Sequence, residues 1–361
     1  MRRLKIFTML LVMGLALLFT NSSLEVQAAS KKPSKVVISN VKSYSYNAVK
    51  ITWKKAKNAK KYQVYRAASS KGSYKLIKTT TATSFVNKDL TTGKTYCYKV
   101  RALNGSKKGA FSAKKSGVPM LKKPTGLQVD NTYDSIAITW NYVNGATKYQ
   151  VCRATSKDGE YEEVKTTKGN YYVHNPAIRG RTYYYKVRAY RVVNGKARYG
   201  AFSSVVSEQI PTLEQIQKSI LSMVNTERAK VGLSPLELYD PINETSQVKA
   251  KDMYDTSNFS HYSENLGYFY DQFDEIGMQY TAGGENIAFG YSTVSSVMKG
   301  WMNSPGHKAN ILGEYTHLGV GYYKGYWVQQ FVTNPNIGET VELPEFCDAI
   351  CVDELLGEQS H

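Results

Sequence analysis

The chain has 361 residues, a length that favours two or three domains over one. Hydrophobic residues make up 42% and charged residues 21%, which is typical of globular proteins and excludes an intrinsically disordered chain. The formal net charge of +18 is spread unevenly: residues 30–125 are rich in lysine, whereas residues 338–361 hold seven acidic residues and no Lys or Arg. Residues 338–361 are therefore treated as an acidic C-terminal tail.

The N-terminus has the three parts of a secretory signal peptide. Basic residues open the chain, residues 6–19 form an apolar run of 14 residues, and Val26-Gln27-Ala28 offers small residues for cleavage. We therefore predict that residues 1–29 are a signal peptide and that the mature protein is secreted, either extracellular or cell-wall associated. The alternative is an uncleaved membrane anchor, but the run is shorter than a spanning helix requires. No later run is long enough, so we predict no transmembrane anchor.

The basic front half of an exported chain favours anionic partners. An anionic cell-wall polymer or an acidic glycan is the expected partner, because long-range attraction concentrates polyanions at a basic surface. The alternative is a basic surface that is only solvated. Nucleic acid is not predicted, because export separates the protein from most of it and no nucleic-acid-binding motif is present.

An internal repeat with an offset of 87 residues occupies the first two thirds of the chain. Matching segments recur with their Trp, Tyr and Gly landmarks in the same order. The pairs include Ile51-Thr52-Trp53 with Ile138-Thr139-Trp140, Tyr62-Gln63-Val64 with Tyr149-Gln150-Val151, and Lys99-Val100-Arg101-Ala102 with Lys186-Val187-Arg188-Ala189. A later pair is offset by 91, which predicts a four-residue insertion at a turn containing Asn194-Gly195.

Each copy alternates apolar and polar residues in short runs separated by turn residues. Val49, Ile51 and Trp53 share one face of an expected strand, and Tyr96, Tyr98 and Val100 share a face of a later one. About 90 residues of such strands, with no helical pattern, predict an all-β immunoglobulin-like sandwich. The early Trp and the late Tyr-x-Tyr-x-Val resemble the fibronectin type III fold over residues 33–118 and 121–210.

The resemblance implies modules that act as spacers or bind a polymer through lysines and exposed tyrosines, and both alternatives stay open. His174, found only in the second copy, is predicted to be a surface residue of a strand or loop. Cys97 and Cys152 lie at non-equivalent places, so we predict no structural disulfide between them. Cys347 and Cys351 lie four apart in the acidic tail and lack further metal ligands nearby.

The pattern becomes helical after Pro211. Thr212 is the predicted N-cap of a first helix that ends by Gly232, and a second helix is expected over residues 242–254 after Asp240-Pro241. Two further helices are expected at residues 294–302 and after Ser304-Pro305-Gly306. Strands are expected over residues 317–323 and 326–332, with His317 as a structural residue at the start of the first. Together these elements predict a three-layer α/β domain.

This segment resembles the SCP-like domains of the CAP superfamily over residues 213–333. The motifs that carry the resemblance follow one another in the order of that family. They are Asn225-Thr226-Glu227-Arg228, Asn258-Phe259-Ser260-His261, Gly284-Glu285-Asn286-Ile287-Ala288, Gly300-Trp301-Met302-Asn303-Ser304-Pro305-Gly306-His307, Asn310-Ile311-Leu312, Gly319-Val320-Gly321-Tyr322 and Tyr326-Trp327-Val328-Gln329-Gln330-Phe331.

The resemblance implies a cleft that contains His261, Glu285 and His307. Many family members carry a second glutamate where this chain has Ser304, so its His/Glu set is incomplete, and residues 213–333 contain no cysteine. Two imidazoles and a carboxylate can hold a divalent metal such as Zn²⁺, or they can form an acid/base set in which Glu285 orients one histidine. The alternative is that His307 only caps a helix and His261 is a surface loop residue.

The other notable residues of this domain are weaker candidates for the functional site. Glu264 is either a fourth ligand or a solvated side chain, and the glycines at 319, 321 and 325 do not form a dinucleotide-binding loop because a hairpin follows them. Trp301 and Trp327 are predicted core residues. Tyr322, Tyr323 and Tyr326 are predicted to line a wet face.

These observations support three alternative functions. The leading one is a non-enzymatic, exported binding protein whose cleft holds a metal, a lipid or a peptide while the basic sandwiches keep it at the cell envelope. The second is a metal-assisted hydrolase of peptide or wall glycan, in which His261 and His307 bind the metal and Glu285 acts as base; Glu285 and His307 are then the candidate catalytic residues. The third is a structural or adhesive wall protein with an inert cleft.

Overall fold

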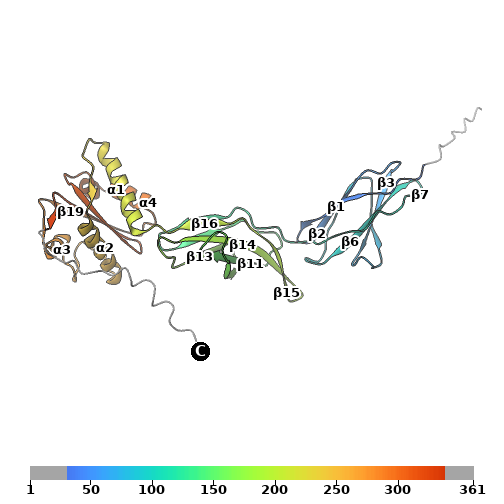
Figure 1. Ribbon diagram of the computed structural model, residues 1–361, viewed down its shortest axis with the longest axis horizontal. Coiled ribbons are helices and arrows are strands. Elements are labelled where there is room, and N and C mark those ends of the chain that lie inside the picture. The colour runs from blue at the N-terminus through green and yellow to red at the C-terminus, as the bar shows by residue number, and fades with distance from the viewer. Residues whose placement is uncertain (1–30, 338–361) are drawn as a thin grey trace, which may run out of the picture. The chain divides into compact units, whose positions relative to one another are not determined.

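The structure, a computed structural model, describes residues 31–337 (Figure 1). The predicted signal peptide, and the acidic tail with Cys347 and Cys351, lie outside the described residues. Two compact units make up the described chain: residues 31–43, 49–88 and 94–118 form the first, and the remainder forms the second.

The first sandwich consists of two antiparallel sheets. One has the order β1-β2-β5, and the other has the order β4-β3-β6-β7 with β8 paired to β6. The strands are β1 (Ile38–Ser45), β2 (Ala48–Trp53), β3 (Lys61–Ala67), β4 (Lys75–Thr80), β5 (Ser84–Asn87), β6 (Tyr96–Asn104), β7 (Lys107–Lys108) and β8 (Lys115–Gly117). The alternating residues predicted to face inward are buried, and Trp53 meets Tyr62 edge to face at 5.5 Å between ring centroids.

The second sandwich repeats this arrangement. Its sheets have the orders β13-β10-β9 and β12-β11-β14-β15, with β16 paired to β14. The strands are β9 (Gln128–Asn131), β10 (Ile136–Thr139), β11 (Lys148–Ala154), β12 (Glu162–Thr167), β13 (Tyr171–His174), β14 (Thr182–Val193), β15 (Lys196–Phe202) and β16 (Val206–Gln209). Trp140 meets Tyr149 at 5.4 Å, the counterpart of the Trp53–Tyr62 pair. The predicted insertion forms the β14–β15 hairpin, whose two turn residues Asn194 and Gly195 both have positive φ.

One sequence prediction about the second sandwich is wrong. His174 is 7% exposed, not a surface residue, because β13 alternates and turns this side chain inward. Its Nδ1 lies 2.7 Å from the Tyr185 hydroxyl, and its Nε2 lies 2.7 Å from Nη1 of Arg153. Cys97 and Cys152 are free thiols and both are buried; burial raises the pKa of Cys152.

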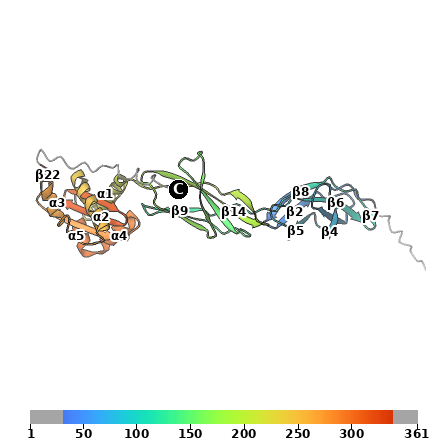
Figure 2. The ribbon, with the colours of Figure 1, turned by 90° about the horizontal axis from the view of Figure 1, so that it is seen from below.

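Within the described residues, the C-terminal domain combines five helices with a four-stranded sheet of order β17-β20-β21-β19. Its helices are labelled in Figure 2. The helices are α1 (Leu213–Ala229), α2 (Asp240–Asp255), α3 (Phe269–Glu275), α4 (Val294–Asn303) and α5 (Pro305–Ile311). The strands are β17 (Glu237–Leu238), β19 (Gly283–Phe289), β20 (His317–Tyr323) and β21 (Tyr326–Val332); β18 (Met278–Gln279) pairs separately with β22 (Asn336–Ile337). Thr212 caps α1 and accepts from the Gln215 amide, as predicted.

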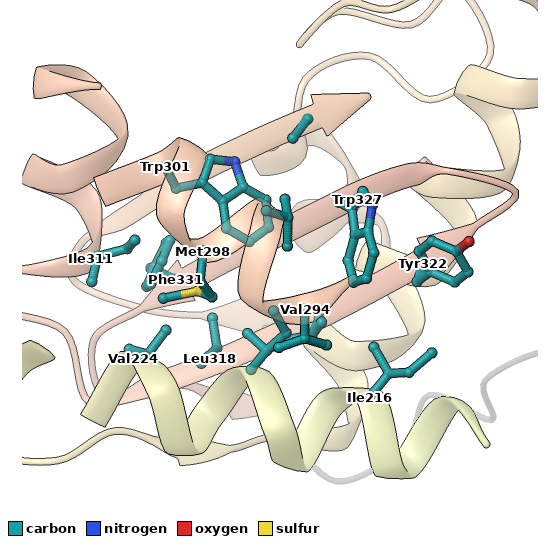
Figure 3. Close-up of a cluster of buried hydrophobic side chains, with 14 of the residues drawn as sticks. Ile216, Val224, Val294, Met298, Trp301, Ile311, Leu318, Tyr322, Trp327 and Phe331 are labelled. Atoms are coloured by element: carbon teal, nitrogen blue, oxygen red, sulfur yellow. The ribbon is translucent and has the colours of Figure 1, made fainter. Parts of the chain in front are cut away.

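The three predicted layers are present. One face of the sheet packs against α1 and α4 in a single apolar cluster that includes Trp301 and Trp327, which are buried as predicted (Figure 3). The other face packs against α2 so closely that Gly319 and Gly321 have no room for a side chain. A three-layer α-β-α arrangement follows, and α2 covers the face that also carries Glu285.

Tyr322 does not line a wet face. It is 2% exposed, because its ring packs in the apolar cluster and against Tyr133 of the second sandwich at 5.7 Å between centroids. Its hydroxyl donates to Asp134 Oδ2 at 2.7 Å, and burial raises its pKa. Tyr322 is therefore a structural residue at which the second sandwich and the C-terminal domain meet.

Candidate functional site

A buried carboxylate lies at the centre of the site. Glu285, in the middle of β19, has a side chain only 1% exposed. One oxygen, Oε1, lies 2.8 Å from Nδ1 of His261, and the other, Oε2, accepts from the Gln330 amide at 3.1 Å. Because a carboxylate accepts, Nδ1 of His261 donates and Nε2 is left as the free ring nitrogen.

The glutamate is held by the adjacent strand and by α2. Gln330 lies opposite Glu285 in the antiparallel β19–β21 pair. Its side-chain oxygen accepts from the hydroxyls of Thr245 (2.7 Å) and Ser246 (3.1 Å) on α2, which orients the amide group toward Glu285. The position of the carboxylate therefore depends on the close contact between α2 and the sheet.

His261 follows α2 in a loop that a buried lysine fastens to the helix. Lys249 on α2 is fully buried, and its Nζ donates to the backbone oxygen of His261 at 3.0 Å. Burial lowers the pKa of Lys249, while the nearby negative charge of Glu285 acts in the opposite direction. Lys249 thus fixes the backbone of His261 and places a positive charge beside the buried carboxylate.

His307 enters the site from the first turn of α5. Its backbone oxygen accepts from the Asn286 amide at 3.0 Å, and Asn310 on the same helix donates to Asn286 Oδ1 (2.8 Å) and to the Glu285 backbone oxygen (3.0 Å). These bonds tie α5 to β19. Burial, and to a lesser degree the proximity of His261, lowers the pKa of the His307 imidazole, which favours its neutral form.

The two imidazoles line one pocket of about 450 Å³. The side of His261 that does not meet Glu285 is open, since its side chain is 50% exposed. Aromatic side chains at the mouth are also exposed, at 50% for Phe259, 48% for Tyr262 and 41% for Tyr268. The lining residues are Phe259, Ser260, His261, Tyr262, Tyr268, Ile287 and His307.

The structure thus brings together His261, Glu285 and His307, while the other candidates lie elsewhere. Glu264 is exposed, and Ser304 lies between α4 and α5 as the residue that ends one helix and precedes the next. Within residues 31–337, no group of three His, Cys, Asp or Glu residues has the arrangement of a metal site. Both oxygens of Glu285 are already hydrogen bonded, so the three residues as arranged do not fit a three-ligand metal centre.

Sequence reasoning missed the residues that support the site. Lys249, Gln330, Asn286 and Asn310 are buried or half-buried polar residues of the network. Asn286, Asn310 and Gln330 lie in motifs that carried the family resemblance, but the sequence alone did not indicate what these amide side chains do. Asn286 and Gln330 could have been found as polar residues inside otherwise apolar strands.

A three-layer α/β domain with a His/Glu pocket, preceded by two fibronectin type III-like sandwiches, is the class of protein that this fold and site define. Residues 221–333 match the profile of the family described as "CAP: Cysteine-rich secretory protein family". The C-terminal domain of this chain is therefore a CAP domain, as its motifs predicted.

Two curated relatives match part of this chain. The chain is 40% identical over 119 residues to "Uncharacterized protein YkwD" of Bacillus subtilis (strain 168), covering 32% of this chain and 46% of that protein. It is 38% identical over 117 residues to "Uncharacterized membrane protein YlbC" of the same organism, covering 32% and 34%. The chain thus spans less than half the length of either relative.

Two solved structures are similar to part of this chain. One is an extracellular protein containing a SCP domain from Bacillus anthracis str. Ames, at 19% identity and TM-score 0.34, covering 58% of this chain and 89% of that one. Another is a two-domain fibronectin type III segment of chicken tenascin, at 18% identity and TM-score 0.34, covering 50% and 100%. In the part of the chain that the structure describes, no helix is both long and apolar enough to span a bilayer.

Proposed function

We propose that this protein is an exported, non-enzymatic binding protein of the cell envelope, whose CAP pocket holds a lipid or a peptide. The observation that carries the proposal is the pocket of about 450 Å³ in which exposed aromatic rings surround the imidazoles of His261 and His307. An apolar group can pack on the rings, and a polar end can hydrogen bond to the imidazoles. The positive charge of the sandwich region holds the protein at an anionic envelope.

The hydrogen bonds that hold the side chains of the site in place support a binding function. Glu285, Gln330 and Lys249 are all buried. Gln330 donates to Glu285, Glu285 accepts from the His261 ring, and Lys249 donates to the His261 backbone oxygen, so His261 is held in place. The pocket residues include one serine, Ser260, which bonds to the backbone amide of Tyr262. Rigid polar groups on an aromatic pocket favour recognition of a ligand.

Removing aromatic surface from the mouth of the pocket should weaken binding of a lipid-like probe. In the double variant Phe259→Ser and Tyr268→Ser, we expect the affinity for dansyl-labelled undecanoic acid to fall about fivefold or more, since each exposed ring contributes on the order of 1 kcal/mol to an apolar contact. Fluorescence titration of the full chain measures this. Tyr142→Ser is the matched control, because Tyr142 is 71% exposed on the second sandwich. An equal loss in the control, or none in either, contradicts the proposal.

The second candidate function is a metal-assisted hydrolase. The hydrogen bond between His261 and Glu285 favours it, because this bond uses Nδ1 of His261 and leaves its Nε2 available as a base or a metal ligand. Zinc would bind to His261 and His307 through their ring nitrogens. We expect ZnCl₂ titration of the full chain to give no site tighter than the micromolar range, and peptide and glycan substrates to stay uncut with or without zinc. Tight binding that is lost in His307→Ala, together with cleavage, would establish the hydrolase instead.

A further inference from the structure

The positive charge of the chain is concentrated in the first sandwich. Residues 31–118 contain 20 lysines and two arginines against a single acidic residue, Asp89, whereas residues 119–211 contain 14 basic and seven acidic residues. No ion pair lies within residues 31–118 of the described chain. Like charges repel in a compact domain, so this excess of positive charge lowers the stability of the first sandwich. The second sandwich has the same fold without it, so the fold does not require the excess.

A row of cations and rings is common to both sandwiches, on the outer face of β6 in the first and of β14 in the second. In the first, Lys99 Nζ lies 4.1 Å from the Phe111 ring and 4.5 Å from the Tyr74 ring, and Arg101 bonds to Gln63. In the second, their counterparts Lys186 and Arg188 lie over Tyr161, Phe202 and Tyr199. Because both copies keep the row, we attribute it to the fold itself.

What differs between the copies is the charge beside the row. Four acids flank it in the second sandwich, at Asp158, Glu160, Glu162 and Glu163, and at the same offset the first sandwich has Lys71, Ser73, Lys75 and Leu76. Glu162 pairs with Arg153 at 2.6 Å, and Glu163 bonds to Gln150; bonds from Thr166 and Gln150, and the charge of Arg188, lower the Glu163 pKa. The second row therefore has negative charges beside it, and the first has none at the same positions.

We propose that the basic face of the first sandwich binds a linear phosphodiester polymer, and that the second sandwich does not. The basic face is the outer face of the β4-β3-β6-β7 sheet around Leu76, Lys99, Arg101 and Lys114. Lys114 Nζ lies 5.8 Å from the Tyr74 ring and bonds to the Ser70 backbone oxygen, next to the row. This inference rests on the proposed function, because it assigns the envelope partner to one module and one face.

The chemistry of the cations favours phosphodiesters over carboxylates. Bidentate recognition of a carboxylate requires a free arginine fork, and both arginines of this sandwich are engaged: Arg101 donates to Gln63 and Tyr65, and Arg66 donates to Asn87. Lysine ammonium groups remain, and these act as point charges that suit a chain of regularly spaced monoanionic phosphates. Such binding weakens steeply with salt, because bound counterions are released.

The two copies supply the substitutions for the test. In the full chain, Leu76→Glu with Lys114→Val copies Glu163 and Val205 of the second sandwich. The pair adds one negative charge and removes one positive charge, so the net charge of the basic face falls by two. The control, Lys42→Val with Lys50→Ala, copies Val129 and Ala137 and removes two charges from exposed positions of β1 and β2, in the other sheet. Both sets use residues that the sandwich fold already accommodates, and thermal unfolding verifies that each variant is folded.

The probe is poly(glycerol phosphate), with binding measured at several salt concentrations. We expect the variant of the basic face to bind about tenfold more weakly at low salt, with a shallower dependence on salt, and the control to lose less than about threefold. The reverse change, Glu163→Leu with Val205→Lys, should increase the affinity. Equal losses in test and control overturn the assignment to this face. The polymer would then bind to the overall positive charge of the sandwich, which leaves the proposed function intact.

Two further arms identify the polymer. Polygalacturonate supplies carboxylates, and single-stranded poly(dT) supplies phosphodiesters with bases. Tighter binding of polygalacturonate than of poly(glycerol phosphate) overturns the proposal, as does an affinity that salt does not change. Tighter binding of poly(dT) supports phosphodiester recognition and identifies a nucleic acid, not a wall polymer, as its source. None of these results affects the CAP pocket, whose lipid probe reports independently on the proposed function.

Discussion

Gly321→Ala is expected to destabilise the CAP domain by about 4 kcal/mol or more. A Cβ at this position would lie 2.0 Å from the Ser246 backbone oxygen and 2.3 Å from its carbonyl carbon, in the helix that covers this face of the sheet. Backbone atoms cannot rotate away as a side chain can, so α2 would have to move as a whole. Calorimetry of the full chain should show the CAP-domain transition lowered by about 10 °C or more.

The same displacement should disturb the site. Ser246, Thr245 and Lys249 lie on α2 and hold Gln330 and the His261 backbone, so a shift of α2 loosens the support of Glu285. Weaker binding of the dansyl probe should therefore accompany the loss of stability.

Gly306→Ala is the matched control for this substitution. It makes the same chemical change in α5, where an added Cβ meets nothing within 4 Å, and alanine favours the helix. We expect it to change stability by less than about 1 kcal/mol. A Gly321→Ala protein as stable as Gly306→Ala would show that α2 does not lie as close to the sheet as described.

Periodicity and capping explain why much of the fold could be predicted. The inward-facing residues of β2, β3 and β6 alternate regularly, and Thr212 and Thr293 cap α1 and α4 with the side chains that helix starts favour. The strand β19 was missed as a strand because it is buried on both faces, and such strands do not alternate. The helix α3 is only seven residues long, too short for a helical period to be recognised.

The site shows a different limit of sequence reasoning. His261, Glu285 and His307 could be selected because their side chains carry chemistry in motifs of a known family. A lysine such as Lys249 in an amphipathic helix normally lies in solvent, so only the fold reveals that it is buried beneath His261. The glycines of Gly319-Val320-Gly321 were noticed for a possible loop, whereas the structure shows that their role is to let a helix approach the sheet.

Acid should destabilise the second sandwich more than the first because of His174. Arg153 can only donate, so the His174 Nε2 that it meets is unprotonated, and Nδ1 donates to Tyr185. Protonation would place two donors face to face in a buried site. Burial first, and then the charge of Arg153, lowers the pKa of His174 to about 4.

The sign and size of the effect follow from linkage. The unfolded chain binds the proton with a pKa of about 6.5, and the folded chain binds it only near pH 4, so protons favour the unfolded state. The stability of the second sandwich should be intact above about pH 6.5 and should fall by about 3 kcal/mol as the pH decreases to about 4 and below.

The first sandwich provides both the substitution and the internal control. Asn87 occupies the position of His174, accepting from Arg66 at 3.2 Å and from the Tyr98 hydroxyl at 3.1 Å, and an amide does not titrate. In His174→Asn we therefore expect the loss that His174 causes between about pH 6.5 and 4 to disappear. Hydrogen exchange of β11 and β14, corrected for intrinsic rates and compared with β3 and β6 in the same sample, measures this. If the wild-type β14 keeps its protection at pH 4 as well as β6 does, His174 is not the buried neutral base described, and the network that joins it to Arg153 and Tyr185 must differ.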